Sequence, residues 1–174
     1  MSDIITAENR DFSCESSHNE KPVPDPRLEQ AAKVCSRQGG KFTPLRRRVY
    51  EILCSASRAM SAYQLMAYLE TETGRRVGPP PIYRALDFLL QQGLIARLES
   101  CNAYFAYKSP VRTQPSVFYI CANCGTIDEA MNSAVEAEIA KTAAKVGFDV
   151  RYRIVELKGI CARCMRIDPT LALN

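Results

Sequence analysis

Four of the eight cysteines stand in two Cys-x-x-Cys pairs. Cys121 and Cys124 lie in "ICANCG", and Cys161 and Cys164 lie in "ICARCM", with thirty-six residues between the pairs. A tight turn directs both sulfurs of a pair toward one point, so two pairs can complete a tetrahedron around one ion. Four thiolates suit zinc and leave no coordination position open, which makes such a site structural rather than catalytic.

Other uses of these four thiols stay open at this level. Iron also accepts four thiolates, so a rubredoxin-like site is an alternative to zinc. A thioredoxin-like motif needs a single pair in a strand–helix–strand context, which two pairs do not match. Disulfides are disfavoured because we expect a cytoplasmic protein. The N-terminus lacks the layout of a secretory signal, and no apolar run approaches the ~18 residues of a membrane helix.

The remaining cysteines and the single histidine carry less information. Cys35 falls on an apolar helical face, where a free cysteine behaves as a small hydrophobe of the core. Cys14 and His18, four residues apart, stand in a polar, acidic segment that ends in "KPVPDP". We interpret residues 1–26 as a disordered arm, in which these two side chains would bind metal only if the arm became ordered.

Helical periodicity predicts three helices before residue 71. The first starts at residue 27 and stops at a glycine pair. Thr43 is the expected N-cap of the second, with Pro44 at its first position. Ser61 and Gln64 form a capping box at the start of the third.

A fourth helix follows three prolines and ends at Gly93. One of its faces is apolar, and the opposite face carries Tyr83, Arg84, Asp87 and Gln91. Two strand-like runs, 94–100 and 103–107, follow and are joined by Cys101-Asn102, since asparagine tolerates the left-handed backbone of a tight turn. This order is typical of a winged helix-turn-helix, whose last helix enters the major groove while the hairpin lies beside the phosphates.

A second domain is expected after a hinge at residues 109–115. Alternating apolar residues predict strands at 116–121, 126–130 and 148–158, with a helix at 131–146. The predicted fold class is therefore α+β, with a winged helix-turn-helix at 27–108 and a small α/β domain at 116–174 that carries the four-cysteine site.

Charge separates these segments. Residues 27–110 carry thirteen bases against six acids, whereas residues 111–174 carry eight bases against seven acids. The basic excess favours a polyanion as the partner of the first domain. An ordinary solvated basic face is the alternative at this level.

The motifs also resemble a known family, the ferric uptake regulators, and look most like its zinc uptake regulator branch. The resemblance runs in order from about residue 28 to 167. It implies a homodimeric repressor that responds to zinc and controls zinc uptake and homeostasis genes by binding AT-rich, pseudo-palindromic operators in double-stranded DNA. Residues 116–174 would then form the dimerisation domain and hold one structural zinc ion through the four cysteines. The motifs that carry the resemblance are "TPLRRRVYEIL", "SAYQLMAYL", "PPPIYRALDFLLQQGLIARLES", "NAYFAY", "FYICANCGTIDE" and "GICARC".

The resemblance assigns DNA contacts to particular residues. Arg84 in "IYRAL" matches the family's base-reading arginine, and an arginine bound to guanine O6 and N7 is the commonest specific contact. Tyr83 would contact thymine methyl groups, and Tyr63 would lie at the DNA backbone or minor groove. The candidate phosphate contacts are Arg46, Arg47 and Arg48.

The regulatory metal site of the family departs from its pattern here. In the family, histidines, a cysteine and a glutamate hold a second zinc ion between the two domains. The matching positions in this chain are Ala96, Tyr107, Gln114 and Glu129, of which only Glu129 is a zinc ligand. Cys101 in the hairpin turn is a substitute donor, and Glu99, Cys14 and His18 are others.

Three functions remain. The first is a zinc-responsive DNA-binding repressor. The second is a family member that keeps structural zinc and DNA binding but has lost zinc sensing. The third is a zinc-stabilised dimeric interaction module. An enzyme is not expected, since the sequence shows no Ser-His-Asp set, paired-carboxylate motif, phosphate loop or open metal triad. Neither a small-molecule substrate nor a membrane partner is expected.

Overall fold

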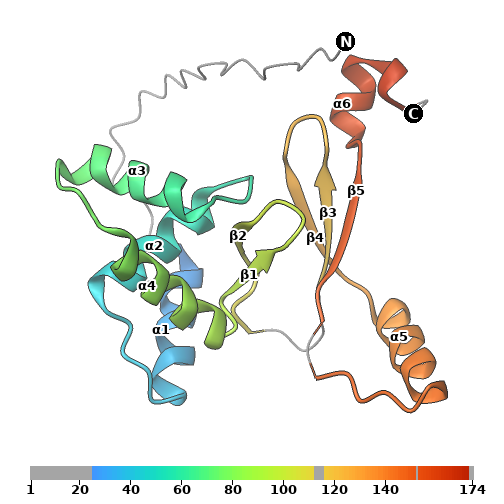
Figure 1. The fold of residues 1–174 in the computed structure, drawn as a ribbon, viewed down its shortest axis with the longest axis horizontal. Helices are drawn as coiled ribbons and strands as arrows, with labels where there is room; N and C mark the ends of the chain where they lie inside the picture. Colours follow the sequence, from blue (N-terminus) through green and yellow to red (C-terminus); the bar gives the residue numbers. More distant parts are fainter. Residues whose placement is uncertain (1–24, 112–115, 152, 173–174) are drawn as a thin grey trace, which may run out of the picture.

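The computed structural model describes residues 25–111, 116–151 and 153–172, so all but the last two residues of the predicted arm lie outside the described residues. The first half contains α1 (Pro26–Arg37), α2 (Pro44–Ser55), α3 (Ala62–Thr73) and α4 (Pro79–Gln91). The antiparallel hairpin of β1 (Ile95–Leu98) and β2 (Ala103–Ala106) follows and lies next to these helices (Figure 1). This is the predicted winged helix-turn-helix, and we call the β1–β2 hairpin the wing.

Local signals set these boundaries largely as predicted. Ser61 and Gln64 make both hydrogen bonds of the capping box at the start of α3. Thr43 is the N-cap residue of α2, but its side chain makes no capping hydrogen bond. Asn102, in the turn of the wing, has a φ of 47°, which is the left-handed conformation expected of it.

The core of the winged helix is apolar and fully enclosed. On α4 the side chains of Ile82, Ala85, Leu86 and Leu89 are buried against α2 and α3, while Tyr83 and Arg84 are exposed, as the periodicity predicted. Cys35 is buried in the same core. Burial of one face therefore fixes which face of α4 points outward.

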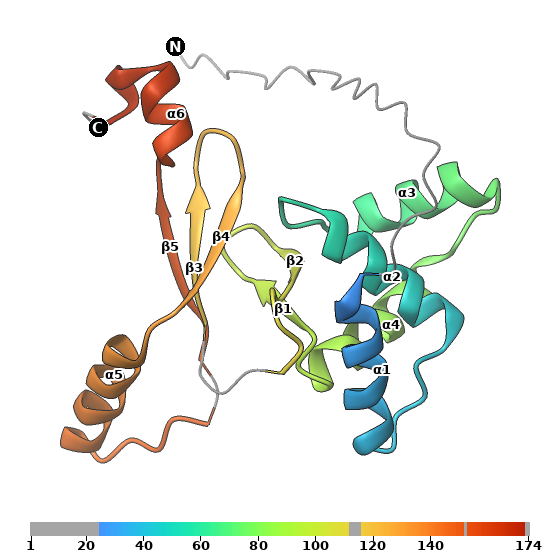
Figure 2. The same ribbon diagram turned by 180° about the vertical axis from the view of Figure 1, so that it is seen from behind.

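The second half forms a three-stranded sheet with helices around it. Its elements are β3 (Ser116–Cys121), β4 (Ile127–Met131), α5 (Ser133–Lys145), β5 (Val155–Gly159), α6 (Ala162–Ile167) and a 3₁₀ turn (Pro169–Ala172). The strand order is β4-β3-β5, with β3 antiparallel to β4 and parallel to β5. Helix α5 stands apart from the rest of the chain in both views (Figures 1 and 2).

The prediction of a strand over residues 148–158 was wrong in its first half, because β5 begins only at Val155. The ladder with β3 begins at the pair of Val155 and Val117 and ends at the pair of Gly159 and Cys121. Alternating apolar side chains such as Phe148, which is exposed, are insufficient without a backbone partner. Helix α6 was not predicted.

The wing packs against the sheet of the second half through an apolar layer. We call this layer the interdomain cluster. Phe118 of β3 lies at its centre, with its ring centroid 6.1 Å from that of Phe105 and 5.7 Å from that of Tyr107. Figure 2 shows the wing beside the β4 edge of the sheet. The cluster consists of Ala96, Leu98, Phe105, Tyr107, Phe118, Ile120 and Ile127, with Ala59 and Ile154 at its margin.

None of the described helices is long and apolar enough to cross a membrane.

Candidate metal centre and nucleic-acid interface

The parallel pairing of β3 and β5 brings the four cysteines together. Cys121, the last residue of β3, is in register with Gly159, the last residue of β5, so the first cysteines of both pairs follow the same edge of the sheet. We call Cys121–Cys124 the first knuckle and Cys161–Cys164 the second. Gly125 closes the first knuckle with a φ of 70°, a conformation that residues with a Cβ rarely adopt. Cys161 is the N-cap residue of α6, which carries Cys164 inward.

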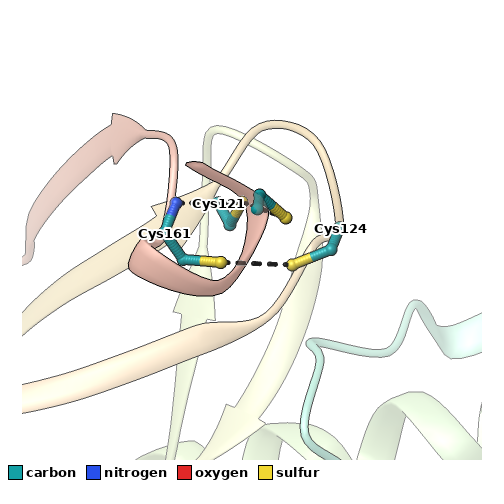
Figure 3. Close-up of side chains that lie close together, drawn as sticks. Cys121, Cys124 and Cys161 are labelled. Carbon is teal, nitrogen blue, oxygen red and sulfur yellow. Dashed lines mark hydrogen bonds between the residues drawn. The ribbon is translucent and has the colours of Figure 1, made fainter. Parts of the chain in front are cut away.

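The distances between the sulfurs fit a tetrahedral zinc site. The Sγ atoms of Cys121 and Cys164 are 3.8 Å apart, and those of Cys124 and Cys161 are 3.7 Å apart (Figure 3). All four sulfurs lie within 4.8 Å of one another. Four sulfurs at ~2.3 Å from one zinc ion would lie about 3.8 Å from each other, so the four thiols need little movement to bind it.

The environment favours thiolates at two of these positions. Burial opposes ionisation of Cys121, but backbone N–H groups of both knuckles stabilise its thiolate and bring its pKa down to about 6. The Thr126 hydroxyl, 3.2 Å from the sulfur of Cys124, lowers the pKa of that thiol. At Cys164 the Asn123 side chain favours ionisation, but burial and the three neighbouring sulfurs raise the pKa to about 12. All four cysteines can therefore be thiolates at the same time only with a cation among them.

The exposed face of α4 presents the side chains predicted to read DNA. Tyr83 is exposed, and Arg84 beside it donates from Nε to the carbonyl oxygen of Pro80 at 3.3 Å. This bond orients the guanidinium and leaves both terminal nitrogens able to donate elsewhere. Tyr63, at the start of α3, exposes 73% of its surface, so its ring is accessible to a partner outside the chain.

The three consecutive arginines of α2 differ in what they contact. Arg46 stacks over the ring of Phe88, with its guanidinium carbon 3.6 Å from the centroid. Arg47 is exposed and pairs with Glu51 on the next turn at 3.1 Å. Arg48 bridges α2 and α3 by pairing with both carboxylate oxygens of Glu72, and it also contacts Glu51. Arg48 therefore has a structural role, and Arg47 is the freest of the three to meet a phosphate.

Comparison with known proteins decides the family. The model of the ferric uptake regulator family matches residues 37–158. The zinc uptake regulation protein of Escherichia coli K12 is 36% identical over 152 residues, which is 86% of this chain and 87% of that protein. The chain belongs to the ferric uptake regulator family. Its similarity to zinc uptake regulators, in sequence and in structure, places it in that branch.

Solved structures of zinc uptake regulators share this fold. A zinc uptake regulator in complex with zinc and DNA superimposes with a TM-score of 0.76 at 36% identity, covering 82% of this chain and 95% of that one. The holo form of the protein XcZur superimposes with a TM-score of 0.71 at 31% identity, covering 80% of this chain and 96% of the other. The match includes both halves of the molecule, because either half alone is shorter than the part covered.

Of the four positions that match the regulatory metal site of the ferric uptake regulators, only Glu129 carries a zinc-ligating side chain. Ala96 and Tyr107 are buried in the interdomain cluster, and Gln114 lies outside the described residues. Cys101 lies in the turn of the wing and is exposed as a residue, but its sulfur is partly buried. This burial and the charge of Glu156 raise the pKa of its thiol. Among the described residues, the two knuckles form the one group of three or more metal-ligating side chains, so neither Glu129 nor Cys101 belongs to such a group.

Glu129 instead accepts one hydrogen bond at each of its carboxylate oxygens. Its carboxylate accepts from the backbone N–H of Lys108 at 2.6 Å and from the hydroxyl of Ser116. The side chain is buried. Both carboxylate oxygens are thus occupied by donors of the protein, which fits an acceptor that joins the two halves of the chain rather than a lone metal ligand.

Sequence reasoning missed the residues that tie the wing turn to the sheet. Glu156 on β5 accepts from the backbone N–H groups of Glu99 at 2.8 Å and Ser100 at 3.2 Å. Lys158, two residues later, donates to the carbonyl oxygen of Ser100 at 3.0 Å. These partners lie 56 to 58 residues apart in the chain, and no local pattern marks such a contact.

Proposed function

We propose that this chain is a homodimeric transcriptional repressor that binds double-stranded DNA operators and holds a structural zinc ion, and that it controls zinc uptake genes as its named relatives do. The observation that carries the proposal is the outward face of α4, where Tyr83 and Arg84 are exposed on a helix fixed by a complete apolar core. The similarity to a regulator solved with zinc and DNA supports the same reading. Such a regulator would work in the cytoplasm, where the operators are.

Recognition of an operator would follow from the geometry of α4. The bond from Arg84 Nε to Pro80 leaves the two terminal nitrogens to donate to O6 and N7 of one guanine. Tyr83 would place its ring against a thymine methyl group. Arg47 and the exposed Tyr63 would contact the backbone, which positions the helix but carries no sequence information.

Helix α5 supports the homodimer. None of its residues is buried, although Val135 and Ile139 form an apolar stripe that Val146 and Phe148 continue beyond the end of the helix. This stripe lines an open hollow of about 550 Å³. A helix gains most of its stability from packing an apolar face, so in the dimer the same face of a second copy would cover it.

The four cysteines would hold the zinc ion. The metal would cross-link the β3–β4 turn, the end of β5 and α6. The site is closed and therefore supplies stability rather than catalysis. We propose a regulator, not an enzyme.

Selection of DNA from a random-sequence duplex pool tests the proposal. We expect the wild-type chain to enrich a pseudo-palindromic site. Arg84→Ala should lose ~1–3 kcal/mol of binding free energy on that site and keep most of its affinity for unrelated duplexes. Arg47→Ala is the matched control: it removes one arginine of the same domain and should weaken binding to all sequences, reducing the slope of log affinity against log salt by about 0.9.

The alternative of an interaction module makes the opposite prediction. If the wild-type chain enriches no sequence and Arg84→Ala leaves duplex binding unchanged while both proteins are dimers, the chain is a zinc-stabilised interaction module and the proposal is wrong.

A further inference from the structure

We infer that packing and hydrogen bonds, without a second metal ion, hold the winged helix against the C-terminal domain of this chain in its DNA-binding arrangement. The inference rests on the proposed function, and it adds how that function is regulated: DNA binding would not rise and fall with free zinc. Three independent sets of contacts between the two halves carry it.

The first set is the interdomain cluster. Its wing residues, including Ala96 and Tyr107, are buried even though they belong to a two-stranded hairpin that would otherwise expose one face. The rings of Phe105 and Tyr107 both pack on Phe118 of the other half. Positions that would carry polar metal donors therefore carry apolar side chains that exclude water and hold the wing by direct contact.

The second set surrounds Glu129. Its carboxylate ties the chain after the wing, at Lys108, to the start of β3, at Ser116. The ammonium of Lys108 also reaches back to β4, contacting the carbonyl oxygen of Glu129 at 3.0 Å and the carboxylate of Asp128 at 2.5 Å. Glu129, the one zinc-ligating side chain among the described regulatory positions, thus joins the two halves through its own hydrogen bonds.

The third set holds the winged helix at two further points. Glu156 and Lys158 bind the backbone of the wing turn. On the other side of the wing, the segment between α2 and α3 connects both halves. Met60 of this segment exchanges two backbone hydrogen bonds with Tyr104 of β2 within the first half. Ser57 of the same segment accepts from the backbone N–H of Ile127 in the second half, beside the first knuckle.

A regulatory zinc ion does not fit this interface. Zinc needs about four donors of suitable type, and the described regulatory positions offer one carboxylate, of which each oxygen already accepts a hydrogen bond. An ion placed there would meet the apolar groups of the interdomain cluster. A ligand can shift an arrangement only through a difference in affinity between two states, and this interface gives zinc no such difference.

The arrangement itself resembles a DNA-bound one. The zinc uptake regulator that superimposes with a TM-score of 0.76 is complexed with zinc and DNA, and the match extends over both domains. The two domains of this chain therefore take up a similar arrangement, held by the three sets of contacts described above.

Operator affinity against buffered free zinc tests the inference on the full-length wild-type chain, with zinc per chain measured in the same samples and the duplex chosen by the selection above. Zinc buffers are set so that the four-cysteine ion stays bound throughout. We expect affinity to change by less than about twofold, with one zinc ion per chain, because no second site links zinc to DNA binding. A second zinc ion that raises affinity about tenfold or more would overturn the inference.

Small-angle scattering separates this test from the proposed function. The radius of gyration of the free dimer should not change with zinc in the same buffers, whether or not the chain binds DNA. A dimer that becomes more compact as a second zinc ion binds would overturn the inference. If instead no duplex binds at any zinc level while the scattering stays constant, the proposed function fails and the metal-independent arrangement stands.

Variants test whether the contacts matter. Tyr107→Ala should lower operator affinity by about tenfold and increase the radius of gyration, because the competent arrangement becomes a minor population. Leu28→Ala is the control, because it removes an equally buried side chain from α1, away from the interface. It should leave the operator affinity and the radius of gyration unchanged. Equal operator affinity and equal size for Tyr107→Ala and the wild type would overturn the inference.

Discussion

Replacement of Cys121 by serine should strongly lower the stability of the C-terminal half. Cys121 ends β3, its sulfur lies 3.8 Å from that of Cys164, and the backbone N–H of Cys161 donates to it at 3.3 Å. The side chain is 4% exposed. A serine oxygen is a poorer zinc ligand than a thiolate and sits closer to the backbone, so it cannot reach the point that the other three sulfurs share.

The size of the effect follows from the four-donor geometry. Binding of a structural zinc ion supplies about 10–16 kcal/mol, so one donor of four accounts for roughly 2.5–4 kcal/mol. This corresponds to a loss in zinc affinity of about two to three orders of magnitude. Total stabilities are typically ~5–15 kcal/mol, so the variant should lose a large share of the stability of this half. Because Ile127 beside the knuckle also binds Ser57, DNA affinity should fall as well.

Competition with a zinc chelator, followed by urea unfolding and sedimentation, measures these quantities. Two other cysteines provide matched controls. Cys101→Ser changes an exposed thiol and should leave both zinc affinity and stability as they are. Cys35→Ser places a hydroxyl in the helical core and should lower stability while zinc affinity stays constant. If Cys121→Ser binds one zinc ion as tightly as the wild type, the four-cysteine assignment is wrong.

Three further predictions concern the contacts around the wing and α2. Glu156→Gln should lower the free energy of unfolding by about 1–2 kcal/mol, because it weakens two hydrogen bonds from backbone N–H groups to a charged acceptor. An unchanged urea midpoint would count against this contact. Arg48→Ala should lower the free energy of unfolding by about 1 kcal/mol or less, since the Arg48 and Glu72 side chains are 36% and 38% exposed. It should leave the salt dependence of DNA binding unchanged, and a clear drop in that slope would instead make Arg48 a phosphate contact. Cys101 should react with iodoacetamide at pH 7 more slowly than the cysteine of an unstructured peptide, because its raised pKa leaves less thiolate; a faster reaction would contradict the raised pKa.

The winged helix was predictable because its signals are local. The capping residues Ser61 and Gln64 stand three positions apart, and the two faces of α4 repeat within a few turns. The knuckles were predictable for a related reason: each pair is a turn, and the ends of two strands were enough to bring the pairs together. In these regions the local preference and the final packing agree.

What the sequence could not provide depends on long-range partners. The strand expected over residues 148–158 is shortened to Val155–Gly159, the segment that pairs with β3 from Val117 to Cys121. The hydrogen bonds of Glu156 to the wing turn and the ring contacts of Phe118 join residues that are distant in the chain. The absence of metal donors at Ala96 and Tyr107 was visible in the sequence, but the apolar contacts that take their place emerged only from the fold.

Native mass spectrometry of the chain bound to its selected duplex tests the central claim most directly, because one mass gives the numbers of chains, zinc ions and duplexes together. We predict an even number of chains with one zinc ion for each chain, held by the four-cysteine site, and the same composition after zinc is added in excess. A complex that forms only with two zinc ions per chain would contradict the claim, since the second ion would then set the arrangement that reads DNA.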